Sequence, residues 1–261
     1  MDDDSSSDFK NINRAVANLE NVKYKELLSN IGRSAIRNKL AVEATHEWLL
    51  FMDCDSVVVS DHYIKNYLQE TEHADLDLIY GGRVYAKNPP EKKEEYLHWL
   101  YGSQREVKPA EERRKNPYAS FMTNNFMIRK SLFLSIQLNE EIKGYGHEDT
   151  LLGIELKKRE AKIKHIENAL LHAGLETAEE FLNKQKQAIK NLAWLIRHGF
   201  ADTEIKIYRY FSLLTKTGLK RLYLRWMKKR EQQYLLRLKG NHPDIKLLDR
   251  LKLFYLAQEL K

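Results

Sequence analysis

The sequence contains little cysteine and no long apolar run, and both absences exclude classes of protein. Cys54 is the single thiol among 261 residues, so an internal disulfide framework is excluded and a reducing compartment is favoured. No apolar run is long enough to span a membrane, and no signal-peptide pattern is visible in the acidic, serine-rich residues 1–9. We therefore expect a cytoplasmic protein, with residues 1–9 as a disordered leader.

Proline is also rare, and it is concentrated in one segment. Four of the five prolines fall within the charged residues 86–118, where they break any long element. This segment is typical of a mobile loop or lid, and it contains a predicted helix over residues 92–101.

Charge is distributed unevenly along the chain. Residues 205–261 hold 15 Lys and Arg against 4 Asp and Glu, although the net charge of the whole chain is only +7. Beyond residue 176 the hydrophobic periodicity predicts helices over residues 178–196, 205–214, 219–238 and 245–260. We therefore predict a main domain over residues 1–175 and a basic helical extension over residues 176–261.

An apolar stretch, residues 48–52, ends at two carboxylates separated by one residue. It predicts a buried strand, after which Asp53 and Asp55 project to the same side of the extended chain. Paired carboxylates favour a hard cation, and open α/β sheets bind ligands at this edge. The alternative is an acidic turn. Cys54 points the other way, and we interpret it as a packing residue.

Two arginines lie near the start of a predicted helix. Apolar residues spaced four apart predict this helix over residues 33–44, after a possible strand at residues 22–28. Arg33 and Arg37 share one face near the helix start, where backbone N–H groups favour an anion. Two solvated arginines on an ordinary helix are the alternative.

Two amides interrupt a later apolar strand. The sequence predicts a helix over residues 61–72, a strand ending in glycines over residues 75–85, and a buried strand over residues 120–129. Asn124 and Asn125 lie within the last of these. Because an unsatisfied buried amide costs about 1–3 kcal/mol, these two either tie down a loop or bind a polar ligand.

A second acidic pair follows an aromatic residue that lies between glycines. Gly144 and Gly146 permit unusual backbone angles around Tyr145, which could then stack on a sugar ring. Glu148 and Asp149 lie at the predicted start of a helix over residues 150–159, where carboxylates are commonly caps.

One histidine follows the last predicted strand. Residues 161–167 predict an edge strand, and His172 lies shortly after it. His172 is a candidate third, imidazole ligand for the cation. The alternative is a hydrogen-bonded structural histidine.

Four motifs in order make the chain resemble a family 2 glycosyltransferase. They are Asp2–Ser5 (D-D-G-S in the family), Gly32–Asn38 (G-x-x-x-x-R-N), Phe51–Asp55 (F-x-D-x-D) and Gly144–Asp149 (G-W/Y-G-x-E-D). The resemblance implies the α/β GT-A fold, with a mixed, mainly parallel sheet between helices. Residues 1–175 would form the catalytic domain.

The resemblance also implies roles for single residues. It implies a nucleotide site made of Asp2, Asp3, Arg33, Arg37, Asn38 and Asp53. It implies a site for Mn2+ or Mg2+ made of Asp53, Asp55 and His172. It implies an acceptor or donor-sugar pocket lined by Gly82, Asn124, Asn125, Tyr145 and Gly146. Asp149 would be the catalytic base, beside Glu148.

The chemistry of glycosyl transfer agrees with these roles. Cleavage at the anomeric carbon develops negative charge on the diphosphate, which a metal and cations stabilise, while a carboxylate takes the acceptor proton. One base without an identifiable nucleophile predicts inversion. We expect an inverting, metal-dependent hexosyl- or N-acetylhexosaminyl-transferase that uses a nucleotide-diphosphate donor, expected to be a UDP-sugar. The acceptor would be a saccharide or a lipid-linked hydroxyl compound in glycan or polysaccharide synthesis.

Two other functions remain open from the sequence. One is a metal-dependent phosphoryl or nucleotidyl transferase, and the other is a truncated, non-catalytic protein that binds a membrane or a partner. The basic amphipathic residues 214–238 could lie on an anionic membrane at its inner face, or could pack their apolar side on the catalytic domain. Nucleic-acid binding is not expected, because no reader motif accompanies the charge.

The chain departs from the family pattern at its beginning. In the family, about one β-α-β unit precedes D-D-G-S, and Asp4 replaces the glycine of that motif here. We expect that an N-terminal β-α-β unit is missing from the chain, and that residues 1–261 bind a sugar nucleotide weakly.

Overall fold

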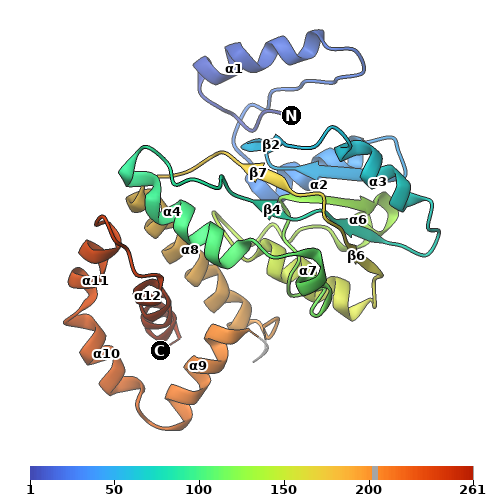
Figure 1. Ribbon diagram of the computed structural model, residues 1–261. Helices are drawn as coiled ribbons and strands as arrows, with labels where there is room; N and C mark the ends of the chain where they lie inside the picture. Colours follow the sequence, from blue (N-terminus) through green and yellow to red (C-terminus); the bar gives the residue numbers. More distant parts are fainter. Residues whose placement is uncertain (202–204, 261) are drawn as a thin grey trace.

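The computed structural model describes residues 1–201 and 205–260 as a mixed α/β fold with a helical C-terminal part (Figure 1). The strands are β1 (Trp48–Met52), β2 (Ser56–Val58), β3 (Leu78–Tyr80), β4 (Arg83–Val84), β5 (Asn125–Arg129), β6 (Ile163–His165) and β7 (Leu170–His172). Helices of the first part are α1 (Ser7–Asn13), α2 (Arg33–Glu43), α3 (Tyr63–Thr71), α4 (Tyr96–Tyr101), α5 (Ala110–Arg114), α6 (Lys130–Ile136) and α7 (Glu148–Lys158). Those of the C-terminal part are α8 (Ala178–Arg197), α9 (Lys206–Lys216), α10 (Lys220–Lys228), α11 (Glu231–Leu238) and α12 (Ile245–Glu259). Short helical turns are η1 (Arg14–Asn18), η2 (Lys93–Glu95) and η3 (Gly102–Glu106).

The larger sheet has the strand order β1-β5-β3-β6. β6 pairs with β3 in parallel, whereas β5 runs antiparallel to both β1 and β3. The predicted mixed sheet is therefore confirmed: three strands share one direction and β5 opposes them. Because β5 is reversed, it begins at the edge where β1 and β3 end, and that edge carries the polar residues of interest.

A smaller sheet, β2-β7-β4, lies beside this edge. β7 pairs antiparallel with β2, so Ser56 lies opposite His172, and it pairs in parallel with β4. This pairing brings the strand that follows Asp55 next to the strand that carries His172.

Aromatic packing holds the larger sheet to its helices. Phe51 of β1 stacks on Phe126 of β5 and contacts Phe133 of α6, with ring centroids 4.9 Å apart in both pairs. All three rings are buried. Stacked aromatic pairs contribute beyond their buried area, so this cluster fixes β1 relative to β5.

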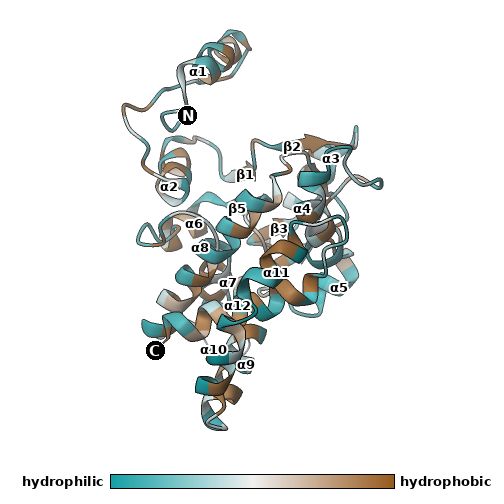
Figure 2. Ribbon diagram, turned by 90° about the vertical axis from the view of Figure 1, so that its left-hand side faces the viewer, coloured by the Kyte–Doolittle hydropathy of each residue, from teal (hydrophilic) through white to brown (hydrophobic). Residues whose placement is uncertain are grey.

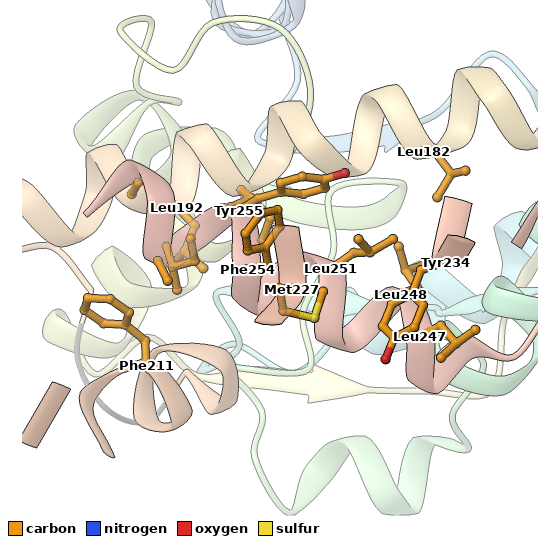
Figure 3. Close-up of a cluster of buried hydrophobic side chains, with 14 of the residues drawn as sticks. Leu182, Leu192, Phe211, Met227, Tyr234, Leu247, Leu248, Leu251, Phe254 and Tyr255 are labelled. Atoms are coloured by element: carbon orange, nitrogen blue, oxygen red, sulfur yellow. The ribbon is translucent and has the colours of Figure 1, made fainter. Parts of the chain in front are cut away.

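The C-terminal helices form a second core. Helices α8 to α11 surround α12, whose Leu251 and Phe254 are fully enclosed (Figure 3). Leu97, Ile142 and Leu151 from the preceding part belong to the same buried cluster. Helix α8 begins at a capping box between Thr177 and Glu180. The C-terminal helices therefore pack directly on the α/β part.

Three sequence-based expectations need correction. The helix predicted over residues 219–238 is two helices, because the chain turns after Met227 and buries Tyr234 and Leu238 against α12. Residues 1–9 are not a loose leader: Asp2 pairs with Glu26, and α1 begins at residue 7. The strand expected over residues 22–28 is reduced to this isolated bridge.

The segment predicted as a lid, residues 86–118, is anchored at several points. It contains α4, as predicted, and it buries Leu97, His98 and Arg113. The Arg113 guanidinium donates to backbone carbonyls at the ends of β3 and β6. The segment is therefore a packed cover over one end of the sheet and not a loose loop.

No helix within the described residues is both long enough and apolar enough to cross a membrane.

Candidate functional site

Polar side chains gather where β1 ends and β5 begins. Met52 pairs with Asn125 in the antiparallel ladder, and the Asp53 N–H then donates to the Asn124 carbonyl at 3.0 Å. The D-x-D motif and the amide pair, about 70 residues apart in sequence, are therefore neighbours across one ladder.

The Asp53 carboxylate lies between two guanidinium groups. Arg37 of α2 donates to its Oδ1 at 2.6 Å, and Arg83 of β4 donates to its Oδ2 at 3.1 Å. The three side chains are only 11 to 13% exposed. Because both carboxylate oxygens accept from arginine, the two guanidinium groups offset the charge of Asp53 and use part of its capacity to accept.

Arg83 connects this carboxylate to the cover segment. It donates to Glu106 of η3 at 3.1 Å, and the Tyr85 hydroxyl donates to the same Glu106 oxygen at 2.6 Å. Burial acts to raise the pKa of Glu106, but Arg83 and Tyr85 outweigh it and hold this pKa below its usual value. Arg83 and Glu106 are not among the residues predicted from the sequence. The available signal was a basic residue directly after the glycines that end β3.

The two amides have different roles. Both are buried, but the Asn125 side chain is fully occupied by two hydroxyl donors and two carbonyl acceptors. Its partners are Tyr63, Tyr67, Gly82 and Asn168. Asn124 accepts from Tyr80, while its Nδ2 has no hydrogen-bond partner among the described residues. Asn125 therefore ties down the loop, whereas a ligand contact of the unpartnered Asn124 Nδ2 stays a prediction.

Helix α7 brings the second acidic pair to the same place. Glu148 and Asp149 form its first turn, and Arg33 of α2 lies 3.5 Å from Glu148 and over the Tyr145 ring. Gly146 has φ +92°, and a Cβ there would lie 2.6 Å from that of Ala188 on α8. Glycine is therefore required at this position, where the Tyr145 loop passes α8.

Both carboxyl groups of this pair have raised pKa values. Burial raises the pKa of Glu148, neighbouring Asp149 adds to the rise, and Arg33 opposes it. Burial also raises the pKa of Asp149, against a hydrogen bond from the Thr150 N–H that lowers it. Two close carboxyl groups with raised pKa values are suited to holding or accepting a proton.

These residues line one cleft of about 240 Å³. Of the residues proposed from the sequence it contains Arg33, Asp53, Asn124, Tyr145, Gly146, Glu148 and Asp149. Arg83 and Glu106 join them, as do Gln185 of α8 and Lys252 of α12. Lys252 donates to the Tyr101 hydroxyl at 2.9 Å. No local motif marks Lys252 or Gln185, since packing of the C-terminal helices alone brings them here.

Asp55 and His172 form a separate pair beside this cleft. His172 Nδ1 lies 3.5 Å from the Asp55 carboxylate, and both buried ring nitrogens of His172 lack a hydrogen-bond partner among the described residues. Burial acts to raise the pKa of Asp55, but His172 and Arg83 outweigh it and keep this pKa below its usual value. An ionised carboxylate and an unpartnered imidazole fit a divalent cation.

The expected three-ligand metal site is not assembled. Within residues 1–201 and 205–260, no three His, Cys, Asp or Glu side chains gather to hold a metal ion. Asp53 is engaged by its two arginines, which leaves Asp55 and His172. Magnesium sites commonly combine one or two carboxylates with substrate phosphates, so two protein ligands are compatible with a cation carried by a diphosphate.

Besides Arg37 and Asn125, four other proposed residues lie outside the cleft lining. Asp2 accepts from the Ser5 N–H, which lowers its pKa, and Asp3 accepts from the two N–H groups that precede α2. Asn38 is buried and exchanges hydrogen bonds with the backbone of Leu138. Gly82, with φ +94°, packs against Arg113. In this structure all four organise the backbone around the cleft.

Comparison with known families and structures gives one family match. The model for the family described as "Glycosyl transferase family 2" matches residues 1–136, which is just over half of the chain. A comparison with curated proteins finds no match.

Solved structures share the fold at low identity. A mannosyltransferase from Pyrobaculum calidifontis in complex with GDP-Man and Mn2+ is 10% identical, with a TM-score of 0.56 over 99% of this chain and 76% of its own. S. aureus TarS is 16% identical, with a TM-score of 0.52 over 99% of this chain and 48% of its own. Residues 1–349 of S. aureus TarS in complex with UDP are 16% identical, with a TM-score of 0.50 over 99% of this chain and 79% of that chain. The predicted GT-A fold is therefore confirmed.

Proposed function

The chain belongs to glycosyl transferase family 2, and we propose that it moves a sugar from a nucleotide-diphosphate donor to an acceptor hydroxyl with inversion. One observation carries this proposal. A single cleft holds an acidic pair with raised pKa values, Glu148 and Asp149, together with the arginine-bound Asp53. An acceptor that loses a proton needs a carboxylate of the first kind, and a leaving group that gains negative charge needs cations such as the arginines beside Asp53.

Asp149 is the proposed base. A carboxylate whose pKa is raised accepts a proton more readily than an ordinary aspartate, provided that it is ionised at the working pH. Arg33 lies beside Glu148 and opposes the rise in its pKa, so it favours the ionised form of Glu148 and offsets its negative charge. Of the other carboxylates that line the cleft in the described part of the chain, Asp53 and Glu106 are paired with arginines and Glu148 adjoins Asp149, so we assign none as a nucleophile and propose single displacement with inversion.

Asp55 and His172 would hold a divalent cation, Mn2+ or Mg2+, and the cation would neutralise charge on the donor diphosphate when bound. The unpartnered nitrogens of His172 support this assignment. Arg37 and Arg83 hold the Asp53 carboxylate in place, and we assign Asp53 to the nucleotide site. We propose a UDP-sugar as the donor, and GDP-sugars are the next to test because the mannosyltransferase of the same fold is in complex with GDP-Man.

The nature of the products tests the reaction class. We expect manganese-dependent release of a nucleoside diphosphate and a β-linked product from an α-linked donor, measured by chromatography and by NMR of the anomeric proton. Donors would first be chosen by screening sugar nucleotides for manganese-dependent thermal stabilisation. Release of phosphate or pyrophosphate would instead support a phosphoryl or nucleotidyl transferase, and an α-linked product would contradict inversion.

Substitution of the proposed base should strongly lower turnover and leave donor binding nearly unchanged. Asp149→Asn is expected to lower kcat by about 10²- to 10⁴-fold, because general-base catalysis contributes that much, with donor affinity changed less than about threefold. Glu155→Gln, on the same helix, is the matched control. In the wild type, kcat should fall as pH drops through a pKa above the ordinary aspartate value, since only the ionised form accepts a proton. Turnover by Asp149→Asn above a tenth of the wild-type rate would contradict the assignment.

Substitution of the cation pair should affect metal-dependent binding first. Asp55→Asn and His172→Gln are each expected to weaken UDP binding in Mn2+ by at least tenfold, with little change in EDTA, as measured by calorimetry. Asp61→Asn, outside the site, is the control. Equal losses with and without Mn2+ would assign the pair a structural role.

A membrane-facing surface on α9 and α10 is the second part of the proposal. Leu213, Leu219, Leu222 and Trp226 are 37 to 66% exposed, and both helices carry hydrophobic and hydrophilic positions (Figure 2). Many of the hydrophilic positions are lysine or arginine. Exposed apolar side chains among cations favour an anionic lipid surface. We propose an enzyme that acts peripherally at the cytoplasmic face of the membrane.

Charge reversal on this surface should release the protein from vesicles. Arg221→Glu with Arg225→Glu is expected to weaken binding to phosphatidylglycerol vesicles at least tenfold, because each basic residue contributes about 1 kcal/mol. Lys87→Glu with Lys115→Glu is a control of equal charge, and co-sedimentation is the measurement. If both double variants bind the vesicles equally well, this surface does not bind the membrane.

A further inference from the structure

A larger cavity of about 570 Å³ lies between α8, α9 and α12. Its volume falls within the range of about 300–1,000 Å³ that is usual for small-molecule sites. Apolar side chains from all three helices line it: Ile189, Leu192, Ile205, Ile207 and Leu253. The interior is suited to a hydrocarbon chain.

This cavity adjoins the catalytic cleft. Four residues line both spaces: His147, Gln185, Ala188 and Lys252. His147 immediately precedes the acidic pair, and its ring lies 3.1 Å from the Thr150 hydroxyl. Burial lowers the pKa of His147 to about 4, so the ring is neutral near pH 7 and adds no charge to the junction. A ligand in the cavity could therefore extend toward Asp149.

Basic side chains surround the apolar lining. They are Arg105, Lys206, Lys246, Arg250 and Lys252, against one lining carboxylate, Asp249. Asp249 accepts from Arg105 at 2.6 Å, which ties η3 to α12 beside the cavity. The surplus of positive charge favours an anionic group on the ligand, such as a phosphate.

These features identify the chemistry of the occupant. A free saccharide would leave the apolar lining unfilled, and a plain hydrocarbon would make no use of the positive charge around that lining. We propose that the cavity between α8, α9 and α12 binds the acceptor as an amphiphile, in which the hydroxyl-bearing head is joined through a phosphate to an apolar chain. The proposal rests on the proposed function, because the head group would extend into the cleft at Asp149. Helix α9 also carries the exposed Leu213 of the membrane-facing surface, so such an acceptor could enter from lipid.

Decyl phosphate, below its critical micelle concentration, is the probe for calorimetry with the full chain. We expect it to bind at least tenfold more tightly than inorganic phosphate or decanol, because chain and anion each contribute. Hexyl phosphate should bind about a hundredfold more weakly, since four methylene groups are removed. If inorganic phosphate binds as tightly as decyl phosphate, the cavity is only an anion site. If decanol binds as tightly, the cavity is only an apolar void. Either result would overturn the proposal.

Variants of exposed or half-buried lining residues locate the binding. Lys206→Glu with Lys246→Glu should weaken the binding of decyl phosphate at least tenfold and leave the binding of decanol unchanged. Ile207→Asn should weaken the binding of both ligands. Lys190→Glu, on the exposed surface of α8, is the control and should change neither. If the lysine pair and Ile207→Asn leave decyl phosphate unaffected, the cavity is not the site.

Donor binding separates this proposal from the proposed function. UDP in Mn2+ should bind equally to the wild type and to the lysine variants, because those lysines lie outside the donor site. If decyl phosphate binds as expected but no nucleotide binds in Mn2+, the amphiphile site stands and the glycosyl-transfer assignment fails. If nucleotide binds and decyl phosphate does not, the acceptor proposal alone fails.

Discussion

The pairing of Asp53 with Arg37 and Arg83 is the constraint on which the site depends. A carboxylate withdrawn from water is strongly unfavourable unless it is paired, and removal of one partner of a buried ion pair typically costs about 3–5 kcal/mol. Each partner comes from a different element: β1, α2 and β4. The pairing therefore fixes the positions of three backbone segments, and through Glu106 it also fixes the cover segment.

The same pairing gives the acidic residues of the site different partners. With Asp53 held by arginines, Asp55 is left to its contact with His172, and the two aspartates of D-x-D serve different partners. On the other side of the cleft, burial raises the pKa values of Glu148 and Asp149 even though both lie at a helix N-terminus, which by itself favours ionised carboxylates. On one side of the cleft the Asp53 carboxylate is paired with arginines. On the other side the carboxyl groups of Glu148 and Asp149 have raised pKa values and are suited to accepting protons.

The C-terminal helices contribute to function as well as to the core. Helix α8 supplies Gln185 to the cleft and Leu192 to the adjoining cavity, and α12 supplies Lys252 to both. Because α8 packs on α12 along its length and also on α4, a change in this packing would alter the cleft and the cavity together. The helical part therefore shares a buried core with the α/β part and also supplies residues to the lining of the cleft.

The sequence by itself determined the local elements and the motifs. Apolar periodicity located β1, α2 and most of the C-terminal helices, and the spacing within D-x-D and around Tyr145 identified the acidic groups of the site. Tertiary structure alone decided which amides are satisfied: Asn125 and Asn38 have backbone and hydroxyl partners, while the Asn124 Nδ2 has none within the described part of the chain. Arg83, Glu106 and Lys252 also became visible only in the fold, because their partners lie between 23 and 151 positions away in the chain. Local patterns report which face of an element is buried, but the pairing of charges depends on contacts between elements that no local pattern encodes.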